Sequence, residues 1–236
     1  MDTNGYFREL PNLEYLSPLS DRNSASEYIQ AKNIFKRVKL REDFHNSFTR
    51  FEKYQIVDGE RPDQVAKKLY DSSKLDWVVL ISAGITNVRN EWPLAERDLY
   101  EFALSAYGAD INATRFYETI EVKDSKDRVI LPAGQVVDYN FKLPTPKIDT
   151  SPTSSYVQYW DNGLNQLVTK TQVTKSISNY QYETRENNKK RGIYVLRNNY
   201  LQQFLNDTRG LMKYKRSSQY VSERLKRTEN LRVKSP

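Results

Sequence analysis

The sequence predicts an α+β protein, and three observations support this fold class. A β-prone segment at residues 54–57 is followed by two amphipathic segments with helical spacing, at residues 62–70 and 75–81. Alternating, turn-rich segments then dominate from residue 109 onward, and a helical pattern and a basic tail close the chain. We therefore expect a strand–helix–helix module with flanking helices, followed by a β-rich region and a C-terminal helix and tail.

The bulk composition restricts the class of protein. A chain of 236 residues holds one domain or two small ones. Hydrophobic residues make up 38%, below the roughly 45–50% of an ordinary globular domain, yet 17 residues are Tyr. Tyr suits protein interfaces, and a tyrosine-rich core fits the composition equally well. Cysteine is absent and His45 is the single histidine, so we expect no disulfide, metal site or cofactor.

Targeting signals are also missing from the sequence. It has no run of 18 apolar residues, so we expect no membrane span. Its start, MDTNGYFREL, has neither the basic nor the apolar region of a signal peptide. We expect the chain to be made in the cytoplasm of the cell that produces it.

The formal charge of +7 lies almost entirely in the tail. Residues 211–236 have two acidic residues, Glu223 and Glu229, and a net charge of +6. The basic residues are Lys213, Lys215, Arg216, Arg224, Lys226, Arg227, Arg232 and Lys234. Such a tail is an interaction arm that does not specify its partner. Its sparse apolar residues predict that it is mobile in the isolated protein.

The first 50 residues predict an N-terminal arm and a helix. Pro11 and Pro18 indicate an extended arm, and Tyr6, Phe7 and Tyr15 are its candidate anchors. The sequence SASE at residues 24–27 fits a helix capping box. Behind it, the spacing of Ala31, Ile34, Phe35 and Val38 predicts one apolar helix face.

Residues 51–108 form the predicted module. Asp58-Gly59 signals a turn, Pro62 suits the first position of a helix, and Gly84 and Gly108 suit helix ends. The spacing of Leu99, Phe102, Ala103 and Ala106 predicts a helix that ends the module. The expected structural core is Tyr54, Val57, Gly59, Pro62, Val65, Ala66, Leu69, Trp77, Leu80, Trp92, Pro93, Leu99 and Phe102.

Residues 109–206 read as β-rich, and residues 207–236 as the basic tail. Two strands are predicted around the turn at residues 123–127, and a hairpin around Asp161-Asn162-Gly163. A Pro/Ser/Thr-rich linker is expected near residues 143–155. A further strand at residues 192–197 precedes a helix marked by Tyr200, Leu201, Phe204 and Leu205.

Nothing in the sequence indicates an enzyme. The eight glycines are scattered, so no phosphate-binding loop is present. Glu118 and Glu121 fall on an alternating pattern, where an odd spacing points them to opposite faces.

Residues 51–87 resemble a LysM module, a unit that binds N-acetylglucosamine polymers beside its first helix and the loop after its second. Here ERPDQVA replaces the usual hydroxyl-rich DTL, and the expected Asn near Ala83 or Gly84 is missing. We predict that sugar binding is lost. Trp77 fits either a stacking surface for a ligand or a core position.

A longer set of segments resembles the baseplate wedge subunit of T-even-type contractile-tailed bacteriophages, the LysM-like protein that links neighbouring wedges. The segments are NIFKRVKL, YQIVDGERPDQVAKKLY, LDWVVLI, EWPL, the helix ending SAYG, YETIEVKDSKDRVILPAGQVVD and SNYQYETRENNKKRGIYVLRNNYLQQF, across residues 10–206. The resemblance implies a docking frame in the virion tail baseplate, in six copies, against a core-bundle protein and a sheath-like wedge subunit.

The candidate partner contacts are Tyr6, Phe7, Tyr15, Lys213, Lys215, Arg216, Arg224, Lys226 and Arg227. Two alternatives stay open. One is a peptidoglycan-binding LysM protein associated with a tail or a cell wall. The other is a nucleic-acid-binding adaptor, which the basic tail alone supports.

Overall fold

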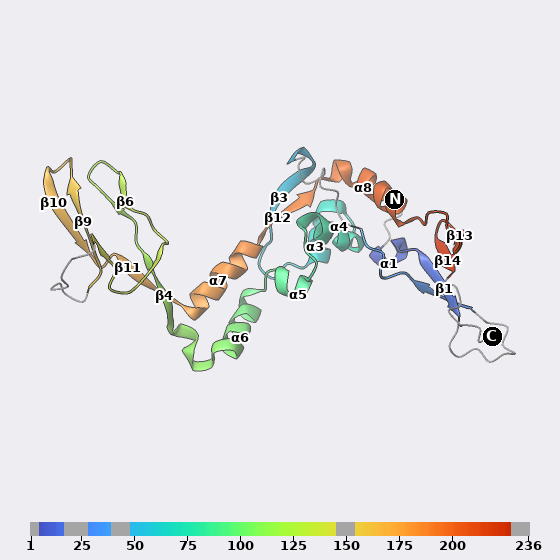
Figure 1. The fold of residues 1–236 in the computed structure, drawn as a ribbon, viewed down its shortest axis with the longest axis horizontal. Coiled ribbons are helices and arrows are strands. Elements are labelled where there is room, and N and C mark those ends of the chain that lie inside the picture. Colours follow the sequence, from blue (N-terminus) through green and yellow to red (C-terminus); the bar gives the residue numbers. More distant parts are fainter. Residues whose placement is uncertain (1–4, 17–27, 39–47, 145–153, 228–236) are drawn as a thin grey trace, which may run out of the picture. The chain divides into compact units, whose positions relative to one another are not determined.

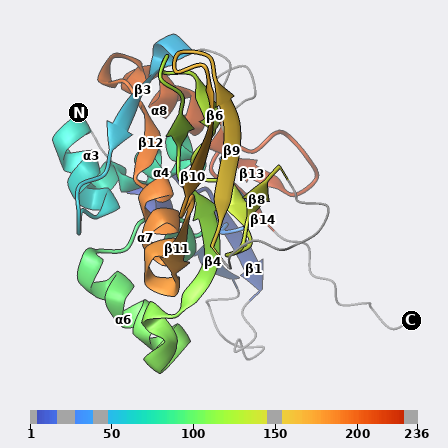
Figure 2. The same cartoon turned by 90° about the vertical axis from the view of Figure 1, so that its left-hand side faces the viewer.

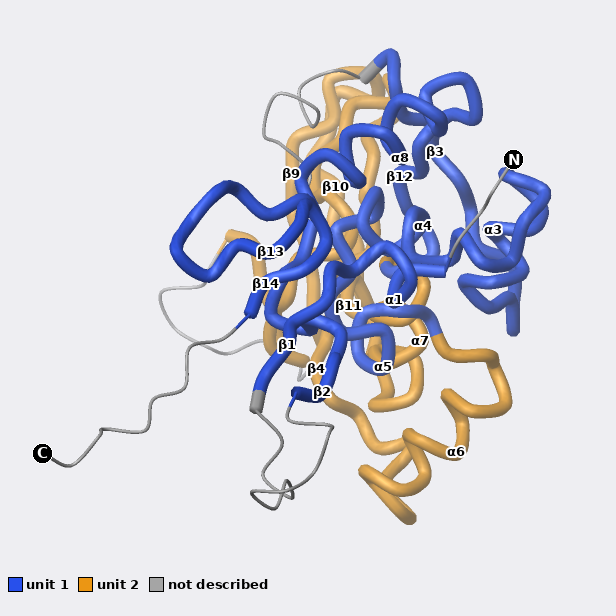
Figure 3. The backbone as a smooth tube through the Cα atoms, turned by 90° about the vertical axis from the view of Figure 1, so that its right-hand side faces the viewer, with its two compact units in different colours: residues 1–93, 190–236 blue, residues 94–189 orange. Residues whose placement is uncertain are grey.

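The computed structural model describes residues 5–16, 28–38, 48–144 and 154–227. It is a mixed α+β structure, with 39% helix and 30% strand in several small sheets (Figure 1). The chain forms two compact units, coloured blue and orange in Figure 3. Unit 1 combines Met1–Pro93 with Lys190–Pro236, and unit 2 is Leu94–Lys189.

The centre of unit 1 is a two-stranded sheet with two helices. Strand β3 (Phe51–Gln55) follows the short helix η1 (Phe48–Arg50) and leads to α3 (Pro62–Tyr70), η2 (Ser73–Leu75) and α4 (Asp76–Ala83). Its partner is β12 (Gly192–Leu196), which pairs antiparallel with it from Phe51↔Leu196 to Gln55↔Gly192. The chain therefore leaves unit 1 after α5 (Val88–Glu91) and returns to complete this sheet.

Local sequence signals explain both helices. Pro62 occupies the first turn of α3, and the Arg61 N–H donates to the Gln64 side chain at 3.0 Å. Gly84 ends α4 in the left-handed conformation, with φ of 72°, and its N–H donates to the Ile81 carbonyl. The predicted helix start at Pro62 and helix end at Gly84 are confirmed.

The core of unit 1 lies between α3, α4, the β3–β12 sheet and α8 (Asn198–Met212). Trp77 is 5% exposed, and its ring lies 5.7 Å from that of Tyr6 and 5.9 Å from that of Phe204. The Tyr70 hydroxyl donates to the Leu196 carbonyl at 2.7 Å, which ties α3 to β12.

Most predicted core positions of unit 1 lie where expected, but Val57 and Gly59 are exposed. Val57 is 58% exposed because β3 ends at Gln55, so Val57 lies in the turn with Gly59. Val65, Ala66, Trp77, Trp92 and Pro93 are buried, and Tyr54, Pro62, Leu69 and Leu80 are half-buried.

Four strands from both ends of the chain form the terminal sheet, in the order β13-β14-β1-β2. Strand β1 (Asn12–Leu16) pairs parallel with β14 (Leu225–Arg227) and antiparallel with β2 (Tyr28–Lys32). Strand β13 (Tyr220–Ser222) pairs with β14, and the short helix α1 (Tyr6–Glu9) precedes β1. The N-terminal segment is extended at β1, as predicted, but it is built into a sheet.

The helix predicted from Ala31, Ile34, Phe35 and Val38 is wrong. Ala31 lies in β2, and Ile34 and Phe35 lie in an exposed turn. The ladder with β1 supplies backbone hydrogen bonds that a helix would otherwise make internally. The SASE segment at residues 24–27 lies outside the described residues.

The prediction of a mobile tail from residue 211 is wrong for residues 211–227. Helix α8 continues to Met212, and β13 and β14 belong to the terminal sheet. Backbone pairing and ion pairs supply the contacts that the sparse apolar residues of this segment do not. Arg232 and Lys234 lie outside the described residues.

Unit 2 contains three small sheets. In one, β4 (Thr114–Thr119) lies between β11 (Thr174–Ser178) and β7 (Val136–Val137). In another, β9 (Tyr156–Asp161) lies between β10 (Gln166–Thr171) and β8 (Lys142–Leu143), and β9 and β10 run side by side in Figure 2. The third is the hairpin of β5 (Val122–Lys123) and β6 (Val129–Leu131).

The β5–β6 and β9–β10 hairpins confirm the two predicted turns. Val122, Leu131, Val157 and Val173 form the apolar core beside them. The central residues of the predicted linker, 145–153, lie outside the described part of the chain.

Helices α6 (Glu96–Tyr107) and α7 (Asn179–Lys190) run through unit 2, with η3 (Gly108–Asn112) after α6. Leu99 is buried as predicted, but Phe102 is 50% exposed, so its core assignment is wrong. The buried residues of α6 are Leu99 and Ala103. Its printed contacts with α7 come from Tyr100, whose ring lies 5.7 Å from that of Tyr180, and from Tyr107, whose hydroxyl donates to Glu183. The compact units thus divide the chain at 93/94, whereas the predicted module runs to residue 108.

Candidate interaction surfaces

The turn after β3 is held by one buried carboxylate. Glu60 is 7% exposed and accepts hydrogen bonds from the Tyr54 hydroxyl at 2.9 Å and the Val57 N–H at 3.1 Å. Lys68 of α3 makes an ion pair with it. The Trp92 indole N–H donates to the Glu60 carbonyl at 2.8 Å. These contacts fix the turn to β3, α3 and Trp92 at once.

The electrostatics of this turn favour an ionised Glu60. Burial raises the pKa of Glu60, but hydrogen bonds from Lys68, the Val57 N–H and Tyr54 outweigh burial and hold the pKa below its ordinary value. Burial and the neighbouring Glu60 raise the pKa of Tyr54. At neutral pH the site is therefore a carboxylate with its oxygens occupied by groups of the chain itself.

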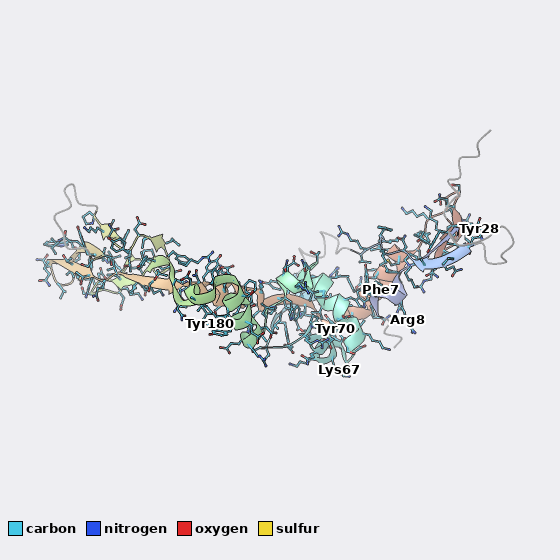
Figure 4. All side chains as sticks on the ribbon, turned by 90° about the horizontal axis from the view of Figure 1, so that it is seen from below. Phe7, Arg8, Tyr28, Lys67, Tyr70 and Tyr180 are labelled. Atoms are coloured by element: carbon cyan, nitrogen blue, oxygen red, sulfur yellow. The ribbon has the colours of Figure 1, made fainter. Side chains whose placement is uncertain are left out.

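A surface cavity of about 670 Å³ lies beside this turn and α3, the first of the two elements that the LysM resemblance places at a sugar groove. Its polar groups are largely engaged. Gln64 accepts from the Arg61 N–H, Asp63 pairs with Arg61 at 3.1 Å, and the Lys67 ammonium donates to the Asp71 carbonyl at 2.8 Å. Figure 4 labels Lys67 and Tyr70 on α3. Few groups remain to bind the hydroxyls of a sugar.

A second cavity, of about 620 Å³, lies between α1 and the start of α4. Trp77 and Tyr6 belong to its inner wall, so Trp77 takes the core role of the two that the sequence allowed. Phe7 is 67% exposed, with its ring 6.0 Å from that of Tyr6 (Figure 4). Of the predicted anchors in α1, Tyr6 packs against the core and Phe7 stays accessible.

Two cations predicted as partner contacts, Arg224 and Arg227, are paired inside unit 1. Glu9 is 1% exposed and accepts from Arg209 at 3.1 Å and Arg224 at 3.3 Å. Arg227 pairs with Glu14 at 2.8 Å. These residues join the first and last described segments of the chain.

The other predicted contacts differ in their exposure. Lys213 pairs with Glu223 at 2.7 Å. Lys215 and Arg216 are exposed, and within the described residues they have no carboxylate partner. Lys226 is half-buried, and Tyr15 is 37% exposed.

Unit 2 has an uncharged surface that sequence reasoning missed. One face of β9 and β10 consists of Tyr156, Gln158, Trp160, Leu167, Thr169 and Thr171. Trp160 is 54% exposed and lies opposite Leu167, which is 58% exposed. Leu164 in the connecting turn is also 58% exposed. The alternation of Tyr156, Gln158 and Trp160 along the strand is the signal that indicates this face.

The two carboxylates of the alternating segment have separate partners. Glu118 is 7% exposed and bonded to Arg185, whereas Glu121 pairs with Lys123 at 3.2 Å. Within the described ranges no three His, Asp or Glu side chains gather as metal ligands. In the same part of the chain, no helix combines the length and the apolar character that crossing a membrane requires.

Comparison with known families identifies the class of the protein. A model of the family described as Base plate wedge protein 53 matches residues 6–213. Comparison with curated proteins gives no match. The family match spans both compact units and most of the chain. The chain therefore belongs to the Base plate wedge protein 53 family, and it is a structural protein of the bacteriophage tail baseplate.

Proposed function

We propose that this chain is a non-enzymatic docking subunit that joins adjacent wedges around the central hub of the baseplate. A protein that joins two neighbours needs at least two separate contact surfaces. The chain offers them on its two compact units: Phe7 on unit 1 and the Trp160–Leu167 face on unit 2. This pair of exposed aromatic surfaces is the observation that carries the proposal.

The composition of these surfaces fits protein contacts. Interface centres are enriched in aromatic residues and depleted of charge. The face of β9 and β10 has no charged residue, although 28% of the chain is charged. Trp160 and Leu167 lie directly opposite each other, so one partner surface can cover both.

The centre of unit 1 supports a docking role over sugar binding. Strand β3 with helices α3 and α4, paired with β12 from a later part of the chain, supports a LysM-like frame in this proposal. Its turn is occupied by internal contacts of Glu60, so the frame can be kept for packing while ligand groups are lost.

The partners that we propose follow from the phage resemblance. They are the core-bundle protein and the sheath-like wedge subunit, and six copies of the chain would join six wedges into a ring. The family places the chain in the virion tail baseplate, where other baseplate components are its neighbours.

Surface variants test this proposal. Trp160→Ser with Leu167→Ser alters unit 2, and Phe7→Ser alters unit 1. We expect each to weaken a different wedge contact by about tenfold or more, since truncating a hot-spot residue at the centre of an interface costs about 2 kcal/mol or more. Binding of each variant to purified wedge proteins, measured by biolayer interferometry, gives the readout.

Lys170→Gln is the matched control, because this exposed side chain lies on the opposite face of β10, and it should bind like the unchanged chain. Loss of the same single contact in both aromatic variants would contradict a two-surface linker. Unchanged binding in both would show that neither surface docks.

A further inference from the structure

The fold gathers the positive charge of the chain around the terminal sheet. In residues 5–16, 28–38 and 209–227, eleven cationic and three acidic side chains give a net charge of +8, against +7 for the whole chain. Sequence reasoning located the excess in the tail alone. Strand pairing adds residues 28–38, which contribute Lys32, Lys36 and Arg37 and no acid.

The three acidic residues of this region are already paired. Glu9 is bonded to Arg209 and Arg224, Glu14 to Arg227, and Glu223 to Lys213. The cations without a carboxylate partner among the described residues are Arg8, Lys32, Lys36, Arg37, Lys215, Arg216 and Lys226. Their charge remains available to an acidic partner.

A turn at residues 33–36 fixes part of this charge in place. The Asn33 N–H donates to the Pro11 carbonyl at 2.8 Å, and its side-chain amide donates to the Tyr214 hydroxyl at 2.9 Å. The Lys36 ammonium donates to the carbonyls of Met212 at 2.9 Å and Lys213 at 2.7 Å. Lys36 thereby caps the C-terminal end of α8, where a cation is favoured.

The same turn presents apolar side chains to solvent. Phe35 is 88% exposed and Ile34 is 65% exposed. The Phe35 N–H donates to the Asn33 side chain at 3.2 Å, so the backbone at Phe35 is positioned by the turn itself. A side chain held on a fixed backbone loses less conformational entropy when it binds. Phe35 is therefore a preorganised anchor beside a cationic surface.

We propose that residues 33–37 and 213–216 form one docking surface, which we call the Phe35 surface, for an acidic protein partner in the baseplate. Phe35 would insert into an apolar pocket, and Lys215, Arg216 and Arg37 would face carboxylates around it. The inference rests on the proposed docking function and adds to it a contact with an acidic protein surface. Tyr28, labelled in Figure 4, begins the neighbouring strand β2, and the Arg227 guanidinium carbon lies 4.6 Å from the centroid of its ring.

The composition of the Phe35 surface favours a protein over other anionic partners. Single-stranded nucleic acid is bound by series of aromatic side chains on which successive bases stack, whereas this turn presents one ring. Anionic bilayers are bound by longer amphipathic helices. A single aromatic anchor ringed by charge matches the centre and rim of a protein interface.

The test measures binding of the full chain to each purified baseplate protein of its phage at low and high salt. We expect Phe35→Ser to weaken binding to an acidic partner by about tenfold or more. Lys215→Glu with Arg216→Glu should slow association and reduce its salt dependence. Tyr194→Ser, at a ring 53% exposed on β12, and Lys175→Glu on β11 are the matched controls and should bind like the unchanged chain.

Three outcomes would contradict the inference. Unchanged affinity of the Phe35→Ser variant, with an unchanged thermal unfolding curve, would remove the Phe35 surface but leave wedge docking through Trp160 intact. Failure of the unchanged chain to bind any baseplate protein would remove the proposed function as well. Phe35-dependent binding to single-stranded DNA or anionic vesicles instead of a protein would show that the partner class is wrong.

Discussion

The role of Trp77 could not be decided from the sequence alone. Its position in α4 fits both a ligand-stacking surface and a core, since either use places an aromatic ring on a helix. The structure decides for the core because Tyr6 and Phe204 cover the ring from segments far away in the chain. Those covering residues could not be assigned to Trp77 from local periodicity.

Replacing Trp77 should therefore destabilise unit 1. We expect Trp77→Ala to lower the free energy of unfolding by about 3–5 kcal/mol, the usual cost of emptying a buried aromatic position. Trp160→Ala is the control, because its ring is 54% exposed, and it should cost less than about 1 kcal/mol. Denaturant melts measure both. Equal losses would contradict the core role of Trp77.

Glu60 predicts a specific dependence of stability on pH. Its pKa in the folded chain lies below its ordinary value of 4.5. Its contribution to stability is thus fully present above the pKa of the unfolded chain and is lost as pH falls through the folded-state pKa. Glu60→Gln should destabilise the protein most at neutral pH, and the difference from the unchanged chain should narrow in acid.

Urea melts at a series of pH values measure this difference. Glu101→Gln is a suitable control, because that carboxylate is 63% exposed and its ion pair among the described residues is with Arg97 of the same helix. A gap between Glu60→Gln and the unchanged chain that stays constant into strong acid would disprove the role given to the Glu60 carboxylate.

At the scale of elements, local sequence signals predicted several helices and a hairpin, but they did not predict which distant strands pair. Helices α3, α4 and α6 and the β9–β10 hairpin follow from caps, periodicity and turn residues within each segment. Strand β12 was predicted as a strand, but its pairing with β3 joins residues far apart in the chain. Nothing within either strand specifies the other as its partner.

The missed elements depend on polar contacts. Helix α7 has little apolar periodicity, and Asn187 is its buried residue. Asn187 bonds the backbone of Leu94 in both directions, at 2.8 and 2.9 Å, and Arg185 bonds Glu118. Likewise, Glu9 looked like an ordinary charged residue, because Arg209 and Arg224 come from the other end of the chain.

Removing the charge of Glu9 should weaken the terminal sheet. We expect Glu9→Gln to cost about 1–3 kcal/mol, since the buried negative charge is lost and an NH2 donor replaces one of the two oxygens that accept from Arg209 and Arg224. Glu14→Gln, at a more exposed carboxylate bonded to Arg227, should cost less. Hydrogen exchange should show faster exchange of the Asn12 amide, which bonds the Arg224 carbonyl, in the Glu9 variant. An unchanged exchange rate of the Asn12 amide in the Glu9→Gln variant would contradict the role of Glu9 in holding the terminal sheet together.

The turn and α3 also predict the absence of a sugar ligand. We expect no useful affinity for N-acetylglucosamine oligomers, because Glu60, Gln64 and Lys67 are engaged within the chain. Isothermal titration calorimetry with these oligomers measures it. Saturable binding at micromolar concentration would favour the peptidoglycan-binding alternative over a docking frame.

At the scale of the whole molecule, the chain is two compact units rather than a row of consecutive domains. Predicted boundaries follow sequence order, whereas unit 1 is assembled from the beginning and the end of the chain. The terminal sheet brings residues 28–38 and 209–227 together. It thereby concentrates positive charge that the sequence alone assigned to the tail. Exposed aromatic residues then remain on each unit, as a joining subunit requires.

The most direct measurement of the joining role is the assembly of wedges with and without this chain. Purified wedges that lack it would be mixed with the hub and followed by sedimentation velocity and electron microscopy. We predict that closed rings form only after the chain is added, and that the Trp160→Ser, Leu167→Ser variant leaves the wedges separate. Rings that form equally well without the chain would contradict its role in joining wedges.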